Sequence, residues 1–141
     1  MRIAYGTDEM TPVTRAIAEH LREAGHQVDE VAKDDEWPEV GRQVGEAVAS
    51  GQADRGIVWC FTGTGVSIAA NKVSGVRAAL CLDAATAAGA RRWNDANVLA
   101  LGLRVTAPTV AEEIVGAFLE TDVDPAERAA ISRVEPSPIA P

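Results

Sequence analysis

The chain has 141 residues, enough for one domain around a single buried core, and its hydrophobic fraction of 47% is ordinary for a globular protein. The formal net charge of -8 argues against nucleic acid as a partner, because phosphate backbones are bound by basic surfaces. We expect a cytoplasmic protein without a membrane partner, since no apolar run is long enough for a span and no signal sequence opens the chain. The two cysteines do not form a disulfide framework, and the two histidines lack metal-ligand spacing.

The first third of the chain alternates short apolar strands with amphipathic helices. Strands are expected at residues 1–6 and 27–31. Thr11 and Pro12 supply an N-cap and a first-turn proline for a helix that Gly25 ends. A second helix opens at Pro38, after an acidic loop at residues 34–36, and ends near residue 50.

The most informative stretch is residues 54–72. An apolar strand at 56–59 leads into Cys60, a glycine-spaced turn at 62–65 and a helix from about Val66. Such a turn before a helix gathers free backbone N–H groups, which suit an anion or a developing oxyanion. Cys60 at its rim is a soft nucleophile or base, whereas Cys81, inside an apolar strand, is predicted to be inert.

The remaining chain repeats the alternation. Strands are expected at 76–81 and 97–101, with helices at 84–93, 110–118 and 125–134. The proline-rich residues 136–141 are expected to form a loose tail. Without a repeat, linker or break in composition, residues 1–135 are predicted to be a single domain.

Five strands alternating with helices predict an α/β fold, a three-layer α/β/α sandwich with a five-stranded parallel sheet of Rossmann-like type. The predicted strand order is 2-1-3-4-5. In such sheets the ligand site lies beyond the carboxyl ends of the strands, where the connections reverse direction. If the first strand neighbours the third, Asp8 and the Cys60 turn meet there.

Several blocks of the sequence, spread over nearly the whole chain, carry a specific resemblance. The chain resembles the ribose-5-phosphate isomerase B family, which includes the galactose-6-phosphate isomerase subunits. The blocks are Asp54–Gly56, Cys60, Thr62–Gly63, Gly65, Ser67–Lys72, Arg77–Cys81 and Asn94–Val98.

The resemblance implies a homodimer or a dimer of dimers, with the site at the subunit interface and without a cofactor or metal. The implied reaction interconverts an aldose and a ketose through an enediolate. Cys60 then moves the proton between adjacent carbons, Thr62 and the glycine turn hold the oxyanion, and Asp8 contacts substrate hydroxyls. Further residues assigned to substrate or oxyanion binding are Gly63, Thr64, Gly65, Ser67, Glu9, Asn97 and Arg133.

Three departures from the family fall on substrate recognition. Glu9 replaces a histidine that helps to hold the substrate phosphate, and a carboxylate repels a phosphate dianion. The family binds phosphate with two arginines one helical turn apart, whereas Arg128 and Arg133 here are five residues apart. Leu82 replaces a histidine to which the resemblance gives a part in opening the furanose ring.

Three hypotheses follow. In the first, the protein isomerises an open-chain or otherwise non-standard sugar, which need not be phosphorylated. In the second, it is a ribose-5-phosphate isomerase with a rebuilt phosphate site, for which Arg91 and Arg92 are candidates. In the third, it is an inactive sugar-binding or partner subunit. Retention of Asp8, Cys60 and Thr62 favours the first two hypotheses.

Overall fold

A computed structural model describes residues 1–135, and the expected tail at 136–141 lies outside them. The strands are β1 (Arg2–Thr7), β2 (Gln27–Lys33), β3 (Arg55–Cys60), β4 (Ala78–Leu80) and β5 (Val98–Gly102). The helices are α1 (Pro12–Glu23), α2 (Trp37–Ala49), α3 (Thr64–Asn71), α4 (Ala84–Asn94), α5 (Pro108–Glu120), the 3₁₀ turn η1 (Pro125–Glu127) and α6 (Arg128–Ile131). Within the described residues, no helix is long and apolar enough to cross a membrane.

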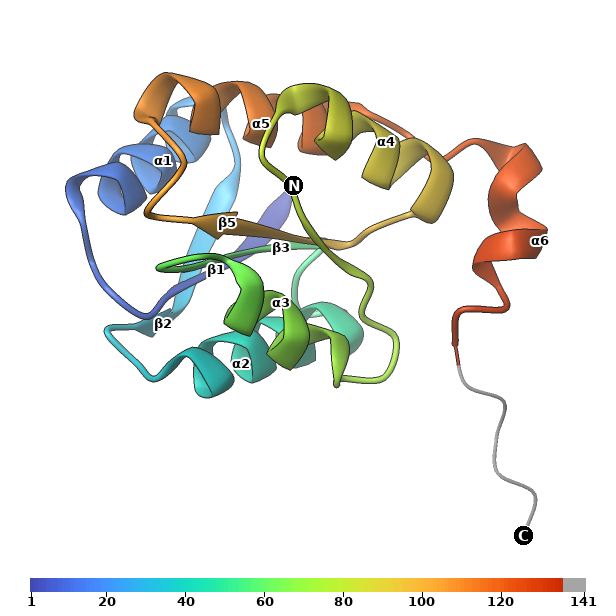
Figure 1. Cartoon of the computed structure of the whole chain (residues 1–141), viewed down its shortest axis with the longest axis horizontal. Coiled ribbons are helices and arrows are strands. Elements are labelled where there is room, and N and C mark those ends of the chain that lie inside the picture. Colours follow the sequence, from blue (N-terminus) through green and yellow to red (C-terminus); the bar gives the residue numbers. More distant parts are fainter. Residues whose placement is uncertain (136–141) are drawn as a thin grey trace, which may run out of the picture.

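The strands form one parallel sheet between two layers of helices, which confirms the predicted α/β/α class. Helices α1, α4 and α5 cover one face, and α2 and α3 cover the other (Figure 1). The helix starts follow the local chemistry that the sequence indicates. The Thr11 hydroxyl accepts the Thr14 backbone N–H, and Pro12 occupies the first turn of α1.

The predicted strand order was wrong at one edge of the sheet. The observed order is β2-β1-β3-β5-β4, so β5 lies between β3 and β4. All five residues of β5 are buried, as an interior strand of a parallel sheet requires. In place of the predicted six-residue strand, β4 has three residues, each partly exposed, which is typical of an edge strand.

Trp59 and Cys60 enter different layers because successive strand residues point to opposite faces. Trp59 is fully buried with Tyr5 and Phe118 in the core under α1, α4 and α5. Cys60 belongs to the second core, formed with α2 and α3. Trp59 therefore does not line the cavity at Cys60.

Candidate functional site

The carboxyl ends of β1 and β3 bring Asp8 and Cys60 to one cavity. Thr7 pairs with Trp59 in the sheet register, so the next residues of the two strands leave the sheet together. The Asp8 backbone N–H still donates to the Trp59 carbonyl at 3.2 Å. The predicted adjacency of the first and third strands is confirmed. A cavity of about 300 Å³ lies there, lined by Asp8, Trp37, Cys60, Phe61, Thr62, Thr64 and Gly65.

The glycine turn places backbone donors on this cavity. Gly63 is the N-cap of α3 and has a φ of 79°, a left-handed conformation that favours glycine. A Cβ on Gly63 would lie 2.6 Å from Leu80 and 2.9 Å from the Leu101 backbone, so crowding also requires glycine. The first turn of α3, which starts at Thr64 rather than at the predicted Val66, leaves backbone N–H groups without intrahelical acceptors. These groups favour negative charge.

The loop after β5 forms backbone hydrogen bonds to the residues that lead into the glycine turn. The Leu103 and Arg104 backbone N–H groups donate to the carbonyls of Cys60 and Phe61, both at 2.9 Å. On the turn itself, the Thr62 and Thr64 hydroxyls are 2.7 Å apart and share a hydrogen bond. The donors are therefore ordered before any ligand arrives, as oxyanion stabilisation requires.

Asp8 is the carboxyl group of the cavity. Its Oδ1 atom is buried and has no hydrogen-bond partner among the described residues. Burial raises the pKa of Asp8 above its ordinary value, and the neighbouring charge of Glu9 raises it further. An unpaired buried carboxyl oxygen costs stability unless a ligand hydroxyl bonds it.

Two aromatic side chains form the walls, and both are exposed in the single chain. Trp37, at the start of α2, packs on Gly65 so closely that a Cβ there would lie 2.9 Å from its ring. Phe61 is 59% exposed, and the guanidinium carbon of Arg104 lies 5.9 Å from the centroid of its ring. Arg104 thus holds a positive charge beside the glycine turn.

Comparison with known proteins identifies the family of the chain. The family model described as Ribose/Galactose Isomerase matches residues 3–135. The chain is 41% identical over 130 residues to galactose-6-phosphate isomerase subunit LacB of Clostridium acetobutylicum, covering 89% of this chain and 75% of that one. It is 37% identical over 130 residues to D-erythrulose-4-phosphate isomerase of Pectobacterium atrosepticum, covering 88% and 86%. The solved ribose-5-phosphate isomerase B of Clostridium thermocellum matches with a TM-score of 0.90 at 38% identity, covering 95% of each chain.

The chain belongs to the Ribose/Galactose Isomerase family. It is therefore an isomerase, and the family resemblance read from its sequence is confirmed. The cavity at Cys60 is the candidate active site of this family member.

The remaining predicted site residues divide into two groups. Glu9 follows Asp8 but is exposed and does not line the cavity, and Ser67 lies in the first turn of α3. Asn97 and Arg133 lie elsewhere. Asn97 precedes β5, level with the start of β3, so five residues of strand, about 16 Å at the usual rise, separate it from the Cys60 level.

Asn97 makes its hydrogen bonds in the loop before β4 and not at the Cys60 cavity. Its Oδ1 accepts the Arg77 backbone N–H at 2.7 Å, and its Nδ2 donates to the Gly75 carbonyl at 2.9 Å. Arg133 lies in the segment after α6 and is exposed. The structure does not bring either residue to the Cys60 cavity of the same chain.

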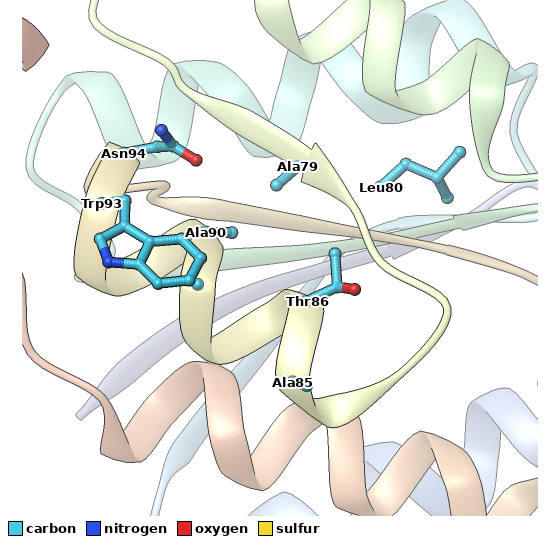
Figure 2. A pocket seen from close by; sticks show the side chains of 8 residues that line it. Ala79, Leu80, Ala85, Thr86, Ala90, Trp93 and Asn94 are labelled. Atoms are coloured by element: carbon cyan, nitrogen blue, oxygen red, sulfur yellow. The ribbon is translucent and has the colours of Figure 1, made fainter.

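A second hollow lies between β4 and α4 (Figure 2). Its lining is mostly apolar and includes Leu80, Thr86, Ala90 and Asn94, with the ring of Trp93 at one side. Its lining residues offer no thiol or carboxylate for proton transfer, and Trp93 lies here rather than at Cys60. Across residues 1–135, no three or more His, Cys, Asp and Glu side chains come together in an arrangement that could hold a metal ion.

Sequence reasoning missed two features of the cavity. Trp37 lines the cavity but was not among the predicted site residues. Because Pro38 starts α2 directly after the carboxyl end of β2, the position of Trp37 at this edge was available from the pattern. Arg104 was not singled out, since its place beside Phe61 depends on β5 neighbouring β3.

Proposed function

We propose that the protein is an aldose–ketose isomerase in which Cys60 carries a proton between C1 and C2 of an open-chain sugar. The proposal rests on one observation: a thiol, a ring of backbone donors and a buried carboxyl oxygen face one cavity. These are the groups that proton abstraction beside a carbonyl requires.

The proposed steps conserve all atoms. The Cys60 thiolate removes the proton from C2 of the aldose, and the electron pair forms the C1–C2 double bond of a cis-enediolate. The negative charge develops on O1, where the donors of the turn at Thr62–Gly65 stabilise it. The thiol then returns the proton to C1. The O2 hydroxyl loses its proton as the carbonyl forms at O2, and O1 takes up a proton, directly from O2 or through solvent, to become the C1 hydroxyl of the ketose. Asp8 orients the hydroxyls through its Oδ1 atom.

We propose a short open-chain sugar phosphate as the first substrate to test. A relative with 37% identity is named D-erythrulose-4-phosphate isomerase. A four-carbon sugar with its O4 oxygen esterified cannot close a furanose ring, so its isomerisation needs no ring-opening group, and Leu82 is then no obstacle. Glu9 is exposed and outside the cavity, so solvent weakens the repulsion that its charge would exert on a phosphate.

An unphosphorylated open-chain sugar is the second candidate. No Lys, Arg or His occurs among the described residues that line the cavity. The carboxylates of Asp8 and residues 34–36 border a neighbouring hollow and make this rim acidic. Such a rim favours a neutral ligand unless basic groups come from elsewhere.

We infer that a second copy of the chain supplies those groups, which makes the protein a homodimer with the site at the interface. Arg133 does not line the Cys60 cavity of its own chain, and Glu135, two residues later, bonds Arg77 and Gly75 at the opposite edge of the sheet. Arg133 would therefore reach a Cys60 cavity from another copy. Large apolar side chains follow three neighbouring strands at the carboxyl edge: Phe61, Leu82 and Val105 are 59%, 60% and 56% exposed. Exposed apolar residues around a site favour an interface.

The test is a panel of aldoses and ketoses of three to six carbons, with and without phosphate, followed by proton NMR. We expect the wild type to interconvert D-erythrose 4-phosphate and D-erythrulose 4-phosphate faster than D-ribose 5-phosphate and D-ribulose 5-phosphate. A preference for the five-carbon pair would contradict the open-chain proposal and support a ribose-5-phosphate isomerase with a rebuilt phosphate site. A wild type that isomerises no sugar in the panel would support an inactive partner subunit.

A further inference from the structure

The C-terminal segment at residues 125–134, here called the strap, is held at its two ends. Neither η1 nor α6 buries a side chain. Before the strap, the Asp124 backbone N–H donates to the Arg92 carbonyl at 2.8 Å. Figure 1 shows α6 standing away from the two helical layers. A segment without buried side chains depends on its end anchors for its position.

The second anchor is Glu135. Its Oε1 accepts a hydrogen bond from Nη1 of Arg77 at 3.1 Å, and its Oε2 accepts one from the Gly75 backbone N–H at 3.3 Å. Arg77 is itself fixed, since it also donates to the Asp95 carbonyl at 2.9 Å. The Arg77 side chain is 21% exposed, so solvent weakens this ion pair less than it weakens a fully exposed one.

Asn97 completes the anchor from the sheet side. It bonds Gly75 and Arg77 through their backbones, the same two residues that hold Glu135. The strap is thereby tied to the start of β5 through two sets of hydrogen bonds. The Asn97–Arg77–Glu135 group is called the latch below.

The strap carries unpaired positive charge. Within residues 1–135, neither Arg128 nor Arg133 makes an ion pair, although the protein has a formal net charge of -8. Arg133 is two residues from Glu135, so the position of its backbone is set directly by the latch. A guanidinium held in place loses less entropy when it binds an anion than one on a free segment.

We propose that Glu135 is a positioning residue, which fixes the strap so that Arg133 meets an anionic group of the substrate in the site of a second copy. The inference rests on the proposed function, because it requires the shared site. The chemical class of ligand is a phosphate monoester, which a guanidinium binds through paired hydrogen bonds.

The experiment compares Glu135→Gln with Glu127→Gln in the full-length protein. Glu127 lies on the strap, and no ion pair involves it among the described residues, so it is matched in chemistry and location. We measure Kd for inorganic phosphate by calorimetry, and KM and kcat for D-erythrose 4-phosphate. Glu135→Gln should weaken phosphate binding and raise KM about 5- to 10-fold, with kcat within about twofold of the wild type. In Glu127→Gln, the Kd for phosphate, KM and kcat should each stay within about twofold of the wild-type value.

Combination with Arg133→Ala tests whether Glu135 acts through Arg133. The double variant should bind phosphate no more weakly than Arg133→Ala alone, because the latch has no guanidinium left to position. Independent, additive effects would overturn the proposal. A fall in kcat at unchanged KM would overturn it as well, since that pattern is not a loss of ligand positioning.

Further readouts separate this inference from the proposed function. Hydrogen exchange at residues 126–134 should speed up in Glu135→Gln and not in Glu127→Gln, and equal exchange in both would overturn the latch. If the wild type isomerises only unphosphorylated sugars and binds no phosphate, the latch proposal fails and the isomerase proposal stands. If the wild type isomerises nothing, the isomerase proposal fails, and phosphate binding by the same variants still decides the role of Glu135.

Discussion

The polar groups at the two edges of the sheet differ in how completely they are hydrogen-bonded. At the carboxyl edge, Asp8 has a buried oxygen without a partner, and Gly63 adopts a left-handed conformation in a crowded turn. At the amino edge, Arg77, Asp95 and Asn97 satisfy one another or the backbone. Unsatisfied groups and strain concentrate at sites that bind ligands, and saturated networks stabilise the chain. We therefore assign the proposed chemistry to the first edge, and the anchoring of the fold and the strap to the second.

The largest expected effect separates the two cysteines. Cys60→Ser should lower turnover about 10³-fold, because a serine hydroxyl is a poor base at neutral pH. Cys81→Ser is the matched control. Burial, with a smaller effect from Asp83, raises the pKa of Cys81 to about 11, and this residue lies in the core under α1, α4 and α5. Kinetics by NMR should show turnover within about threefold of the wild type in Cys81→Ser. Equal losses of turnover in the two variants would contradict the assignment of proton transfer to Cys60 alone.

Gly63→Ala tests the crowding of the glycine turn. The left-handed φ and contacts under 3 Å should together lower the free energy of unfolding by about 2–4 kcal/mol. Gly25→Ala is the control, because Gly25 also has a positive φ but no heavy atom within 4 Å of an added Cβ. It should cost about 1 kcal/mol in denaturant unfolding. Similar losses of unfolding free energy in Gly63→Ala and Gly25→Ala would show that the packing around the turn is loose.

Asn97→Ala tests the amino edge. Removing the side chain leaves the Arg77 N–H and the Gly75 carbonyl without their partner, which should cost about 2 kcal/mol. We expect kcat to stay within about threefold, because Asn97 lies far from Cys60. Asn94→Ala, at an exposed asparagine of the same region, serves as the control for unfolding. If Asn97→Ala lowered kcat and left the free energy of unfolding unchanged, Asn97 would have to be assigned to the active site.

The smallest effect concerns Asp8 and pH. Because its pKa is raised in the folded state, folding favours the protonated carboxyl, and the charged form costs stability at neutral pH. Asp8→Asn should therefore raise Tm by about 2 °C at pH 7, while it lowers turnover. The difference in Tm should shrink as the pH falls through the folded pKa and the wild-type carboxyl takes up its proton. A constant difference between pH 4 and pH 8 would contradict this assignment.

The sequence predicted the structural features that depend on local residue patterns. The apolar strands, Pro12, and the glycine turn after Cys60 indicated the layers and the candidate site, and Asp8 followed from the adjacency of β1 and β3. Lateral strand order was not available, because β4 and β5 are both short and apolar, and their burial differs only after folding. Asn97 belongs to one of the blocks that carry the family resemblance, but its hydrogen bonds depend on the register of β5. The position of Arg133 depends on a tertiary contact through Glu135, 58 residues from Arg77.

The central claim is that the Cys60 thiol moves a carbon-bound proton at the glycine turn. Incubation with D-erythrulose 4-phosphate in D₂O, followed by proton NMR, tests this claim directly. The account predicts that the wild type replaces one C1 proton of the ketose by deuterium, that Cys81→Ser does the same, and that Cys60→Ser leaves the C1 signal intact. Deuterium incorporation by Cys60→Ser at the wild-type rate would contradict the account.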